Sequence, residues 1–411
     1  IFEKWDLNCE EIGKVTDDKN LAFFYNKQCI ANIPAESLVL GGGAPVYKRE
    51  YKEPSYYSRY KTFNISSILP PESIIDVAKK MIKLPNIASK KWIYEQYDST
   101  VRTNTVQGPG GSAGVIRIKG SNKGLAVSTD CNGRYVYIDP YKGGQIAVLE
   151  SARNVVCTGA KPLAITNCLN YGNPNDPEIY WQFKESVTGV GDACKKLNTP
   201  VTGGNVSFYN ETKDGAVFPT PVIGMVGELE DISHQTSMEY KNPGDFIICL
   251  GSLNGKLGGS EYLKTIHGKI EGPLANIDMD YELSVQSLCL KAIQLGILNS
   301  AHDLSDGGLA VNIAESIIKA NKSIGAKISI ESKLRADELL FGECQSVIIA
   351  TINPKDIATL TSLNKHGDIH IQTIGKVTDN SRLLVNDLID IDKSKLESSY
   401  FSYYSETLEI K

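Results

Sequence analysis

Apolar residues between positions 113 and 376 change repeatedly between the spacing of helices and the spacing of strands. The helical spacing predicts a helix over 143–158 and another from Asp176-Pro177, a typical helix start, to about Leu197. Short apolar runs predict strands at 113–119, 124–129 and 222–229, and a strand that begins at Val201 and stops at Gly203-Gly204. After a polar stretch at 230–243, the predicted order is strand 245–251, helix 281–296, helix 307–319, strand 325–330, strand 346–352, helix 354–362 and strand 369–376. This mixture predicts α/β or α+β domains.

One six-residue sequence occurs twice, at 12–17 and at 374–379, which indicates an internal duplication. The match extends to Asp6-Leu7 with Asp368-Ile369 and to Leu21 with Leu383. More than a hundred residues of predicted domain precede the second copy, whereas only eleven residues precede the first. We therefore expect the chain to hold the end of a first repeat and a whole second repeat, so that any site shared between the repeats is incomplete.

The domain boundaries follow from this duplication and from turn-forming residues. We expect residues 1–33 to be the C-terminal remnant of the first repeat. Residues 34–80, which are rich in glycine, proline and tyrosine, are expected to form a connector. The second repeat would then consist of an N-terminal-type domain at 81–232 and a C-terminal-type domain at 233–411, with a turn at Asn242-Pro243-Gly244 near their boundary.

Composition narrows the class of protein. The chain has 411 residues, of which 41% are hydrophobic and 22% charged, as in ordinary globular proteins. The net charge of -5 argues against a nucleic-acid partner, and no apolar run approaches the ~18 residues of a membrane span. Nine cysteines without a C-x-x-C pair suggest reduced thiols and a cytoplasmic location.

The densest candidate for binding chemistry is Thr202–Glu211. Gly203 and Gly204 permit close approach of a phosphate to the backbone, and Asn205 and Ser207 offer oxygen atoms suited to Mg²⁺ or phosphate. A tight Gly-Gly turn between strands explains the same pattern without a ligand.

Three further segments carry candidate ligands. Ile165–Pro174, which includes Asn167, is expected to be a polar loop at a strand end or only a turn before a helix. Glu150 and Asn154 share one helix face, where they could hold a metal ion or simply be solvated. Ala301–Leu309 joins a strand to a helix, and its polar groups suit metal-phosphate binding, although Asp306 could be only a helix cap.

In combination, several of these sequences resemble phosphoribosylformylglycinamidine synthase, in its small-type synthetase subunit. The residues that carry the resemblance are Asp130-Cys-Asn-Gly-Arg-Tyr135, Glu150-Ser-Ala-Arg-Asn154, Leu169-Asn-Tyr-Gly-Asn-Pro174, Gly204-Asn-Val-Ser-Phe-Tyr-Asn-Glu211, Pro219-Thr-Pro-Val222 and His302-Asp-Leu-Ser-Asp-Gly-Gly-Leu309. The resemblance covers nearly the whole chain. It implies the duplicated two-domain fold shared with aminoimidazole ribonucleotide synthetase, with this chain as the C-terminal half.

The resemblance also implies a reaction and its partners. Such enzymes are ATP-dependent carbon–nitrogen ligases that convert formylglycinamide ribonucleotide to formylglycinamidine ribonucleotide in purine biosynthesis, with ATP and Mg²⁺ as cofactors. The expected partners are the N-terminal half of the same synthetase, a glutaminase subunit that supplies ammonia and a small bridging subunit. The catalytic histidines of the family belong to the first half, so the resemblance assigns no catalytic residue to this chain.

Residue by residue, the resemblance implies that Asn167 and Gly204 contact ATP, Asn205 binds Mg²⁺ and Ser207 contacts the substrate. Asn167 replaces an aspartate that is usual in the family. An auxiliary nucleotide and Mg²⁺ site would match the residues Glu150, Asn154, Asp303 and Ser305, with Ser112 in place of an expected aspartate.

Two other functions remain open at this point. A stand-alone ATP-dependent synthetase of the same superfamily would need a catalytic Cys or Lys in the Gly-rich segment 103–114, which contains neither. A non-catalytic scaffold, stabilised by a nucleotide and docking partner subunits, would need only the auxiliary site.

Overall fold

The computed structural model describes residues 1–39, 41–43, 45–365 and 367–408. These form two compact units, Ile1–Glu50 (the N-terminal unit) and Tyr51–Lys411 (the large unit), which divide inside the predicted connector. The N-terminal unit contains a β-hairpin of β1 (Asn20–Tyr25) and β2 (Gln28–Pro34). Its two turn residues, Asn26 and Lys27, both have positive φ, the geometry that suits the twist of a two-residue hairpin loop.

The first half of the large unit is built on a six-stranded sheet. In sheet order its strands are β3 (Thr105–Gln107), β4 (Gly114–Arg117), β5 (Gly124–Asp130), β10 (Thr220–Leu229), β6 (Lys161–Asn170) and β7 (Val201–Ser207). All neighbours are antiparallel except β6 and β7, which are parallel and joined by helix α6 (Pro177–Leu197). A small hairpin, β8 (Glu211–Thr212) and β9 (Gly215–Ala216), follows β7.

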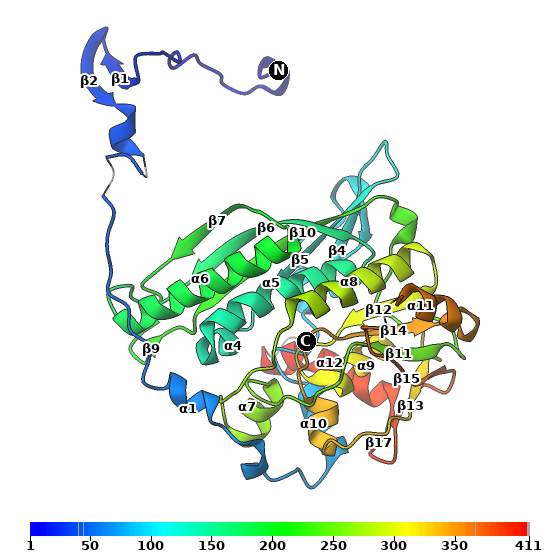
Figure 1. Ribbon diagram of the computed structural model, residues 1–411. Coiled ribbons are helices and arrows are strands. Elements are labelled where there is room, and N and C mark those ends of the chain that lie inside the picture. The colour runs from blue at the N-terminus through cyan, green and yellow to red at the C-terminus, as the bar shows by residue number, and fades with distance from the viewer. Residues whose placement is uncertain (40, 44, 366, 409–411) are drawn as a thin grey trace. The chain divides into compact units, whose positions relative to one another are not determined.

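Helices cover one face of this sheet, and in the described part of the chain the opposite face, which we call the open face, has exposed side chains. Figure 1 shows α5 (Pro140–Val156) and α6 lying over the same face. Alternation along β10 buries Ile223 and Met225 beneath these helices, while Val226 points to the opposite face. On that open face Val226 is in register with Val127 of β5, whose side chain is 45% exposed.

The second half of the large unit is built on a seven-stranded sheet. In sheet order its strands are β12 (Leu298–Asp303), β14 (Ile348–Ile352), β11 (Phe246–Leu250), β15 (Ile371–Thr378), β13 (Gly325–Ile328), β16 (Arg382–Val385) and β17 (Ile389–Asp392). Strand β11 is apolar throughout because both its faces are covered. The adjacent side chains of Ile247 and Ile248 point to opposite faces of the sheet and belong to two different clusters of buried apolar residues.

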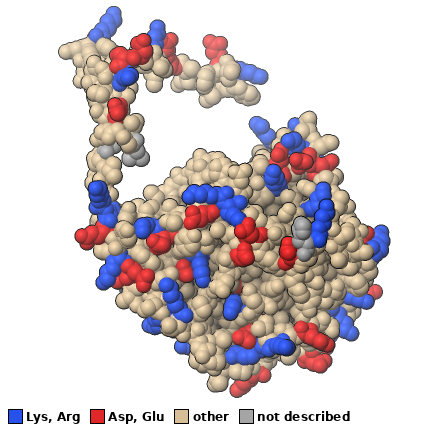
Figure 2. All heavy atoms as spheres, in the orientation of Figure 1, with Lys and Arg blue, Asp and Glu red and all other residues tan. Residues whose placement is uncertain are grey.

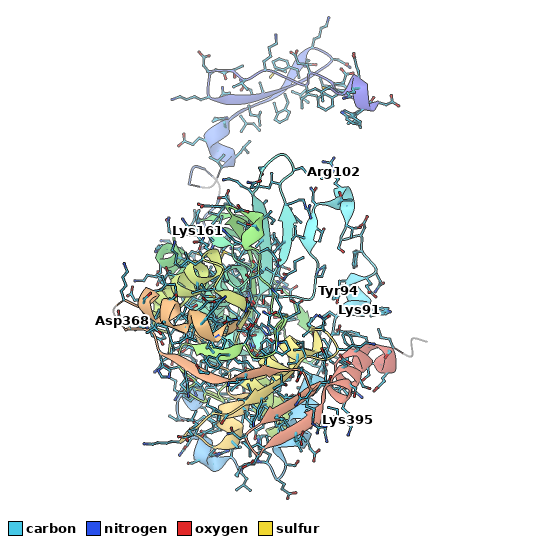
Figure 3. The ribbon with its side chains drawn as sticks, turned by 90° about the vertical axis from the view of Figure 1, so that its right-hand side faces the viewer. Lys91, Tyr94, Arg102, Lys161, Asp368 and Lys395 are labelled. Atoms are coloured by element: carbon cyan, nitrogen blue, oxygen red, sulfur yellow. The ribbon has the colours of Figure 1, made fainter. Side chains whose placement is uncertain are left out.

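The remaining helices surround these sheets. They are α1 (Tyr57–Lys61), α2 (Ile74–Ile82), α3 (Lys91–Tyr94), α4 (Gly133–Ile138), α7 (Glu261–His267), α8 (Met279–Gln294), α9 (Gly308–Ile318), α10 (Ala336–Phe341), α11 (Ile357–Leu363) and α12 (Lys393–Thr407). Figure 3 shows α3, marked by Lys91 and Tyr94, between the turn that carries Arg102 and helix α12, which carries Lys395. On the face in Figure 2, positive and negative side chains are interspersed. Among the described residues, no helix has the length and apolarity needed to cross a bilayer.

The mixed α/β fold class predicted from the sequence is confirmed, and most predicted elements are present. Two strand ends were predicted wrongly. Strand β7 does not stop at Gly203-Gly204 but continues to Ser207, and β6 extends to Asn170, so that Asn167 lies in a strand and not in a loop. The alternative role of Asp306 as a helix cap is also wrong, because the N-cap of α9 is Gly307.

Candidate functional site

Two parallel strands bring together the four residues matched to ATP, metal and substrate. In the register of β6 and β7, Asn167 lies beside Gly204, Cys168 beside Asn205, and Asn170 beside Ser207. We call Asn167, Gly204, Asn205 and Ser207 the β6–β7 edge, because β7 is the last strand of the described sheet.

Close packing explains the glycine in this edge. The side-chain oxygen of Asn167 lies against Gly204, where a β-carbon would overlap it. Gly204 also has a φ of +155°, a conformation that L side chains rarely adopt. Gly203 differs, since a β-carbon built there meets no heavy atom of the described residues within 4 Å.

The edge presents its residues on two faces. Asn167 and Gly204 are in register with the helix-covered Ile223, whereas Asn205 follows Cys168 and Val222 onto the open face. A single ligand that contacts Asn167 and Gly204 on one face and Asn205 on the other must therefore extend around the free edge of β7. This differs from the simple phosphate-binding loop expected from the sequence.

Ser207 is held by a local network at the end of β7. Its hydroxyl donates to Asn210 Oδ1 at 3.2 Å, and its carbonyl accepts from the Asn210 side chain at 2.9 Å. The Ser207 carbonyl also accepts from Tyr171 N at 2.9 Å, which ties β7 to the segment after β6.

A second polar region, which we call the acid cavity, lies where the two halves of the large unit meet. It is a hollow of about 390 Å³. Three of the four residues matched to the auxiliary site line it, namely Glu150, Asn154 and Ser305. Asp130 and Ser112 line it as well, and the Asn154 side chain donates to Asp130 Oδ2 at 3.1 Å.

Asp303, the fourth residue of that set, has a different environment from the one expected. It lies behind the cavity with 1% of its surface exposed, and its Oδ1 accepts from Arg153 Nε at 2.5 Å. Arg153 also donates to Glu282 Oε2 and to Gln345 Oε1, each at 2.9 Å, and lies 3.8 Å from Glu150. Asp303 was matched to the auxiliary nucleotide and Mg²⁺ site, but it does not line the cavity and its carboxylate is paired with the buried Arg153 guanidinium.

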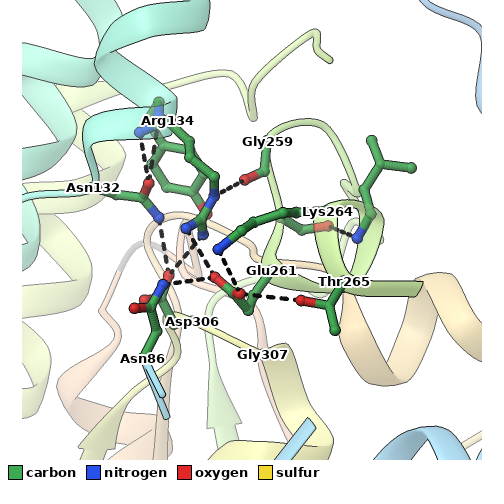
Figure 4. A network of polar contacts seen from close by, with 12 residues as sticks. Asn86, Asn132, Arg134, Gly259, Glu261, Lys264, Thr265, Asp306 and Gly307 are labelled. Atoms are coloured by element: carbon green, nitrogen blue, oxygen red, sulfur yellow. Dashed lines mark hydrogen bonds and ion pairs between the residues drawn. The ribbon is translucent and has the colours of Figure 1, made fainter. Parts of the chain in front are cut away.

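A second arginine, Arg134, lies beside the loop that joins β12 to α9 (Figure 4). Arg134 Nη1 pairs with Glu261 Oε2 at 2.8 Å, and Asn132 donates to Asp306 Oδ1 at 3.0 Å. Glu343 accepts from the backbone N–H of Gly307 at 2.8 Å and from the Tyr135 hydroxyl. These contacts fix the start of α9 beside the cavity.

Burial raises the pKa of two carboxyl groups in the acid cavity, Asp130 and Glu150, and of Asp303 behind it. Burial, reinforced by the negative charge of Asp303, raises the pKa of Asp130 to about 8. Burial raises the pKa of Glu150 well above its ordinary value, with Asp130 as the next cause. Burial also raises the pKa of Asp303 to about 6, against the opposing effect of Arg153.

Both regions offer oxygen donors of the kind that Mg²⁺ prefers, but neither forms a complete metal site. Among the described residues there is no cluster of three His, Cys, Asp or Glu side chains that could hold a metal. Ser112 Oγ and Asp303 Oδ2 are buried without a hydrogen-bond partner. The residues fit a magnesium ion that arrives with nucleotide phosphates, since Mg²⁺ commonly takes only one or two protein carboxylates in such sites.

Sequence reasoning assigned no role to Arg153, Arg134 or Asp130, although each lies within a motif quoted above. The i, i+3 spacing of Glu150 and Arg153 was the available local signal for one of these contacts. The contacts of Arg153 with Glu282 and Asp303 join residues 129 and 150 positions apart, so no local pattern predicts them.

Comparison with known proteins identifies both halves of the large unit. Residues 110–229 match the family described as AIR synthase related protein, N-terminal domain, and residues 242–386 match its C-terminal domain. The phosphoribosylformylglycinamidine synthase subunit PurL of Alkaliphilus metalliredigens is 46% identical over 380 residues, which are 92% of this chain and 51% of that protein. The same subunit of Caldanaerobacter subterraneus is 45% identical over 403 residues, 97% of this chain and 54% of that protein.

Solved structures agree at the level of the fold. PurL of Thermotoga maritima complexed with ADP superposes with a TM-score of 0.60 at 18% identity, covering 78% of this chain and 51% of that one. A structure described as PurLQS from Thermotoga maritima gives a TM-score of 0.61 at 16% identity and covers 85% of this chain and 55% of that one. The chain thus spans about half the length of the relatives it matches. It belongs to the AIR synthase related family, together with the phosphoribosylformylglycinamidine synthase subunit PurL.

Proposed function

We propose that this chain is the C-terminal half of a synthetase that converts formylglycinamide ribonucleotide, ATP and ammonia to formylglycinamidine ribonucleotide, ADP and phosphate in purine biosynthesis. The observation that carries this proposal is the 45% identity to a PurL subunit across 97% of the chain. In this reaction ATP phosphorylates the amide oxygen of the substrate, and ammonia then displaces phosphate.

The β6–β7 edge would form one wall of the active site. Asn167 and Gly204 would contact ATP, Asn205 would hold a Mg²⁺ ion bound to its phosphates, and Ser207 would contact the ribonucleotide. When bound, Mg²⁺ would neutralise charge on the transferring phosphoryl group. The catalytic groups would come from the first half of the synthetase, so the chain alone would not turn over.

We expect a partner to dock on the open face of the six-stranded sheet, which is the face on which Asn205 lies. Val127 and Ala164 flank Val226 on this face, and a flat apolar sheet surface favours burial against another sheet. The expected occupant is the N-terminal half of the synthetase. A glutaminase subunit and a bridging subunit would complete the assembly and supply ammonia.

The assay that tests this function uses the chain coexpressed with the part of the Caldanaerobacter subunit that lies outside the 403 matched residues. The purified pair, given ATP, Mg²⁺, ammonium chloride and formylglycinamide ribonucleotide, is expected to form ADP only when the ribonucleotide is present. ADP formation that is independent of the ribonucleotide, or none at all, contradicts the proposal.

The acid cavity favours a second, compatible function, in which a nucleotide with Mg²⁺ stabilises the chain as a scaffold. Glu150, Asn154 and Ser305 would contact the metal and phosphates, while Asp303 would act through Arg153 and not as a ligand. Calorimetry with ADP and Mg²⁺ tests this for the wild-type chain and for Ser305→Ala, with the exposed Ser332→Ala as the control. Equal binding by all three proteins, or no binding by the wild type, excludes the cavity as a nucleotide site.

A further inference from the structure

The turn that follows β7 brings Asn210 back against Ser207. The turn depends on Tyr209, which has a φ of 62° and whose backbone N–H donates to the Gly172 carbonyl at 2.9 Å. A left-handed backbone is uncommon for a residue with a large side chain and costs free energy, so the surrounding structure has to hold it in place. The turn places the Asn210 side chain beside the Ser207 hydroxyl.

The hydrogen bonds of the Asn210 side chain fix the orientation of its amide. Its Nδ2 donates to the Tyr171 carbonyl at 3.0 Å and to the Ser207 carbonyl at 2.9 Å. Turning the amide over would place its oxygen against these two carbonyl oxygens, which cannot donate. Asn210 Oδ1 is therefore the atom that faces Ser207 Oγ, and it can only accept.

The Tyr171 carbonyl is held firmly in its place. The Tyr171 side chain is 0% exposed, its hydroxyl forms a hydrogen bond with Ser186 Oγ at 2.6 Å, and its ring packs edge-on against Phe183. The same carbonyl also accepts from the backbone N–H of Asn210 at 3.1 Å. Helix α6, which carries Ser186 and Phe183, thus anchors the amide of Asn210 through Tyr171.

This arrangement determines what the Ser207 hydroxyl can offer to a ligand. A serine hydroxyl has one proton and two lone pairs, and here the proton is donated to Asn210 Oδ1 at 3.2 Å. Among the described residues, no N–H or O–H group donates to Ser207 Oγ, so its lone pairs remain for a ligand. Ser207 is half-buried and lies two residues after Asn205, so both side chains belong to the open face.

We propose that Asn210 is a positioning residue for the ribonucleotide, because it holds the Ser207 hydroxyl as a hydrogen-bond acceptor. The ligand group that faces Ser207 must then be a donor. The ribose hydroxyls and amide N–H groups of formylglycinamide ribonucleotide are donors, whereas its phosphate mainly accepts at neutral pH. Ser207 therefore recognises the ribose or amide part of the substrate and not its phosphate. This inference rests on the ribonucleotide contact of Ser207 in the proposed function.

The experiment is a double-mutant cycle, with calorimetry of ribonucleotide binding as its readout. The chain is coexpressed with the part of the Caldanaerobacter subunit outside the 403 matched residues. Ser207→Ala should weaken binding about tenfold and Asn210→Ala about fivefold. If Asn210 acts through Ser207, the double variant should bind within about twofold of Ser207→Ala. Losses that multiply in the double variant, or no loss in Ser207→Ala, overturn the inference.

Two further measurements separate positioning from a general loss of structure. The affinity for Mg-ATP should stay within about twofold of the wild type in all three variants, because none of them changes Asn167 or Gly204. Asn386→Ala is the matched control, since the Asn386 amide bonds both the carbonyl and the N–H of Ile330, each at 3.0 Å, in the turn between β16 and β17. This control should leave the ribonucleotide affinity unchanged. A loss of ribonucleotide affinity in the control equal to that in Asn210→Ala, or an equal loss of Mg-ATP affinity in Asn210→Ala, overturns the inference.

The polarity of the contact is tested with Ser207→Ala alone. A phosphate monoester gains its second negative charge near a pH of about 6, and this charge strengthens a hydrogen bond donated to it. If Ser207 accepts from a hydroxyl or amide group, the ratio of the ribonucleotide affinities of the wild type and Ser207→Ala should be the same at pH 5 and pH 8. A ratio that rises with pH places the phosphate at Ser207 and overturns the inference.

The readouts separate this inference from the proposed function. Ribonucleotide binding that follows the expected cycle without ADP formation contradicts the function and keeps the inference. ADP formation that depends on the ribonucleotide, together with losses that multiply in the double variant, does the reverse. A coexpressed pair that does not bind the ribonucleotide contradicts both.

Discussion

Arg153 Nε donates to Asp303 Oδ1 at 2.5 Å, and this buried ion pair joins helix α5 of one sheet domain to strand β12 of the other. The same guanidinium bonds Glu282, whose second oxygen accepts from Gln286 at 2.6 Å. Charges at this depth are tolerated because each carboxylate has the arginine as its partner. The pair therefore ties the two sheet domains together next to the acid cavity.

Replacing Arg153 with Met should be strongly destabilising. Two buried carboxylates would lose their cation, which costs about 3–5 kcal/mol in comparable buried pairs. Thermal or urea unfolding of the chain measures this loss. As a control, Lys195→Met breaks the exposed pair with Asp192 and should cost less than about 1 kcal/mol. Similar unfolding midpoints for the two variants would show that Arg153 does not stabilise the junction of the two sheet domains.

The raised pKa of Asp130 predicts a specific pH dependence. A carboxyl whose pKa rises from 3.8 to about 8 on folding binds its proton more tightly in the folded state. Its contribution to stability is therefore full below pH 4 and is lost as the pH rises through about 8. Asp130→Asn removes this titration. Between pH 5 and pH 9 the free energy of unfolding of this variant should therefore decrease by less than that of the wild type, with a difference of more than about 1 kcal/mol.

The control for this experiment is Asp214→Asn, since Asp214 is exposed. The free energy of unfolding of the Asp214→Asn protein should fall with rising pH as steeply as that of the wild type. If Asp130→Asn has the same slope as these two proteins, Asp130 is ionised throughout and the account of the cavity is wrong.

Gly204 and Gly203 form a matched pair for testing the β6–β7 edge. Gly204→Ala forces Asn167 to move and strains the backbone, so we expect a loss of about 1–3 kcal/mol in stability and weaker Mg-ATP binding by the coexpressed pair. Gly203→Ala meets open space and should stay within about 0.5 kcal/mol of the wild type. Thermal unfolding and nucleotide calorimetry provide the two measurements, and equal ATP affinity for both variants would remove Gly204 from the site.

Asn205→Ala should lower synthetase activity of the coexpressed pair about tenfold or more and leave the fold intact, because a metal-ligating oxygen is lost from an exposed strand. The loss should be partly recovered at high Mg²⁺ concentration. Val201→Ala, a truncation elsewhere on the same exposed strand, serves as the control. Rates that are unchanged at every Mg²⁺ concentration would show that Asn205 is not a metal ligand and has only a structural role in β7.

Local signals in the sequence predicted those elements that local interactions determine. Helix α6 begins as expected, with Asp176 accepting from Glu178 N at 2.8 Å and Pro177 in the first turn. The end of β7 was predicted wrongly because paired glycines usually interrupt a strand, whereas here Gly204 is needed for the approach of Asn167.

Long-range interactions determine the remainder. Ile12 and Ile374 begin identical six-residue sequences, but only the second lies between two strands of a described sheet. The contacts of Arg153 beside the acid cavity could not be predicted from local sequence, because its partner Gln345 is 192 positions away. The pairing of Glu150 and Asn154 on one cavity wall was predictable because it depends only on helical spacing.

The measurement that tests the central claim most directly is phosphate release by the isolated chain. It is supplied with ATP, Mg²⁺, ammonium chloride and formylglycinamide ribonucleotide, and compared with the same mixture without the ribonucleotide. If the chain contributes one wall of an active site that the first half completes, the two rates will be equal. Phosphate release that depends on the ribonucleotide would show that this chain is a complete synthetase and would contradict the account.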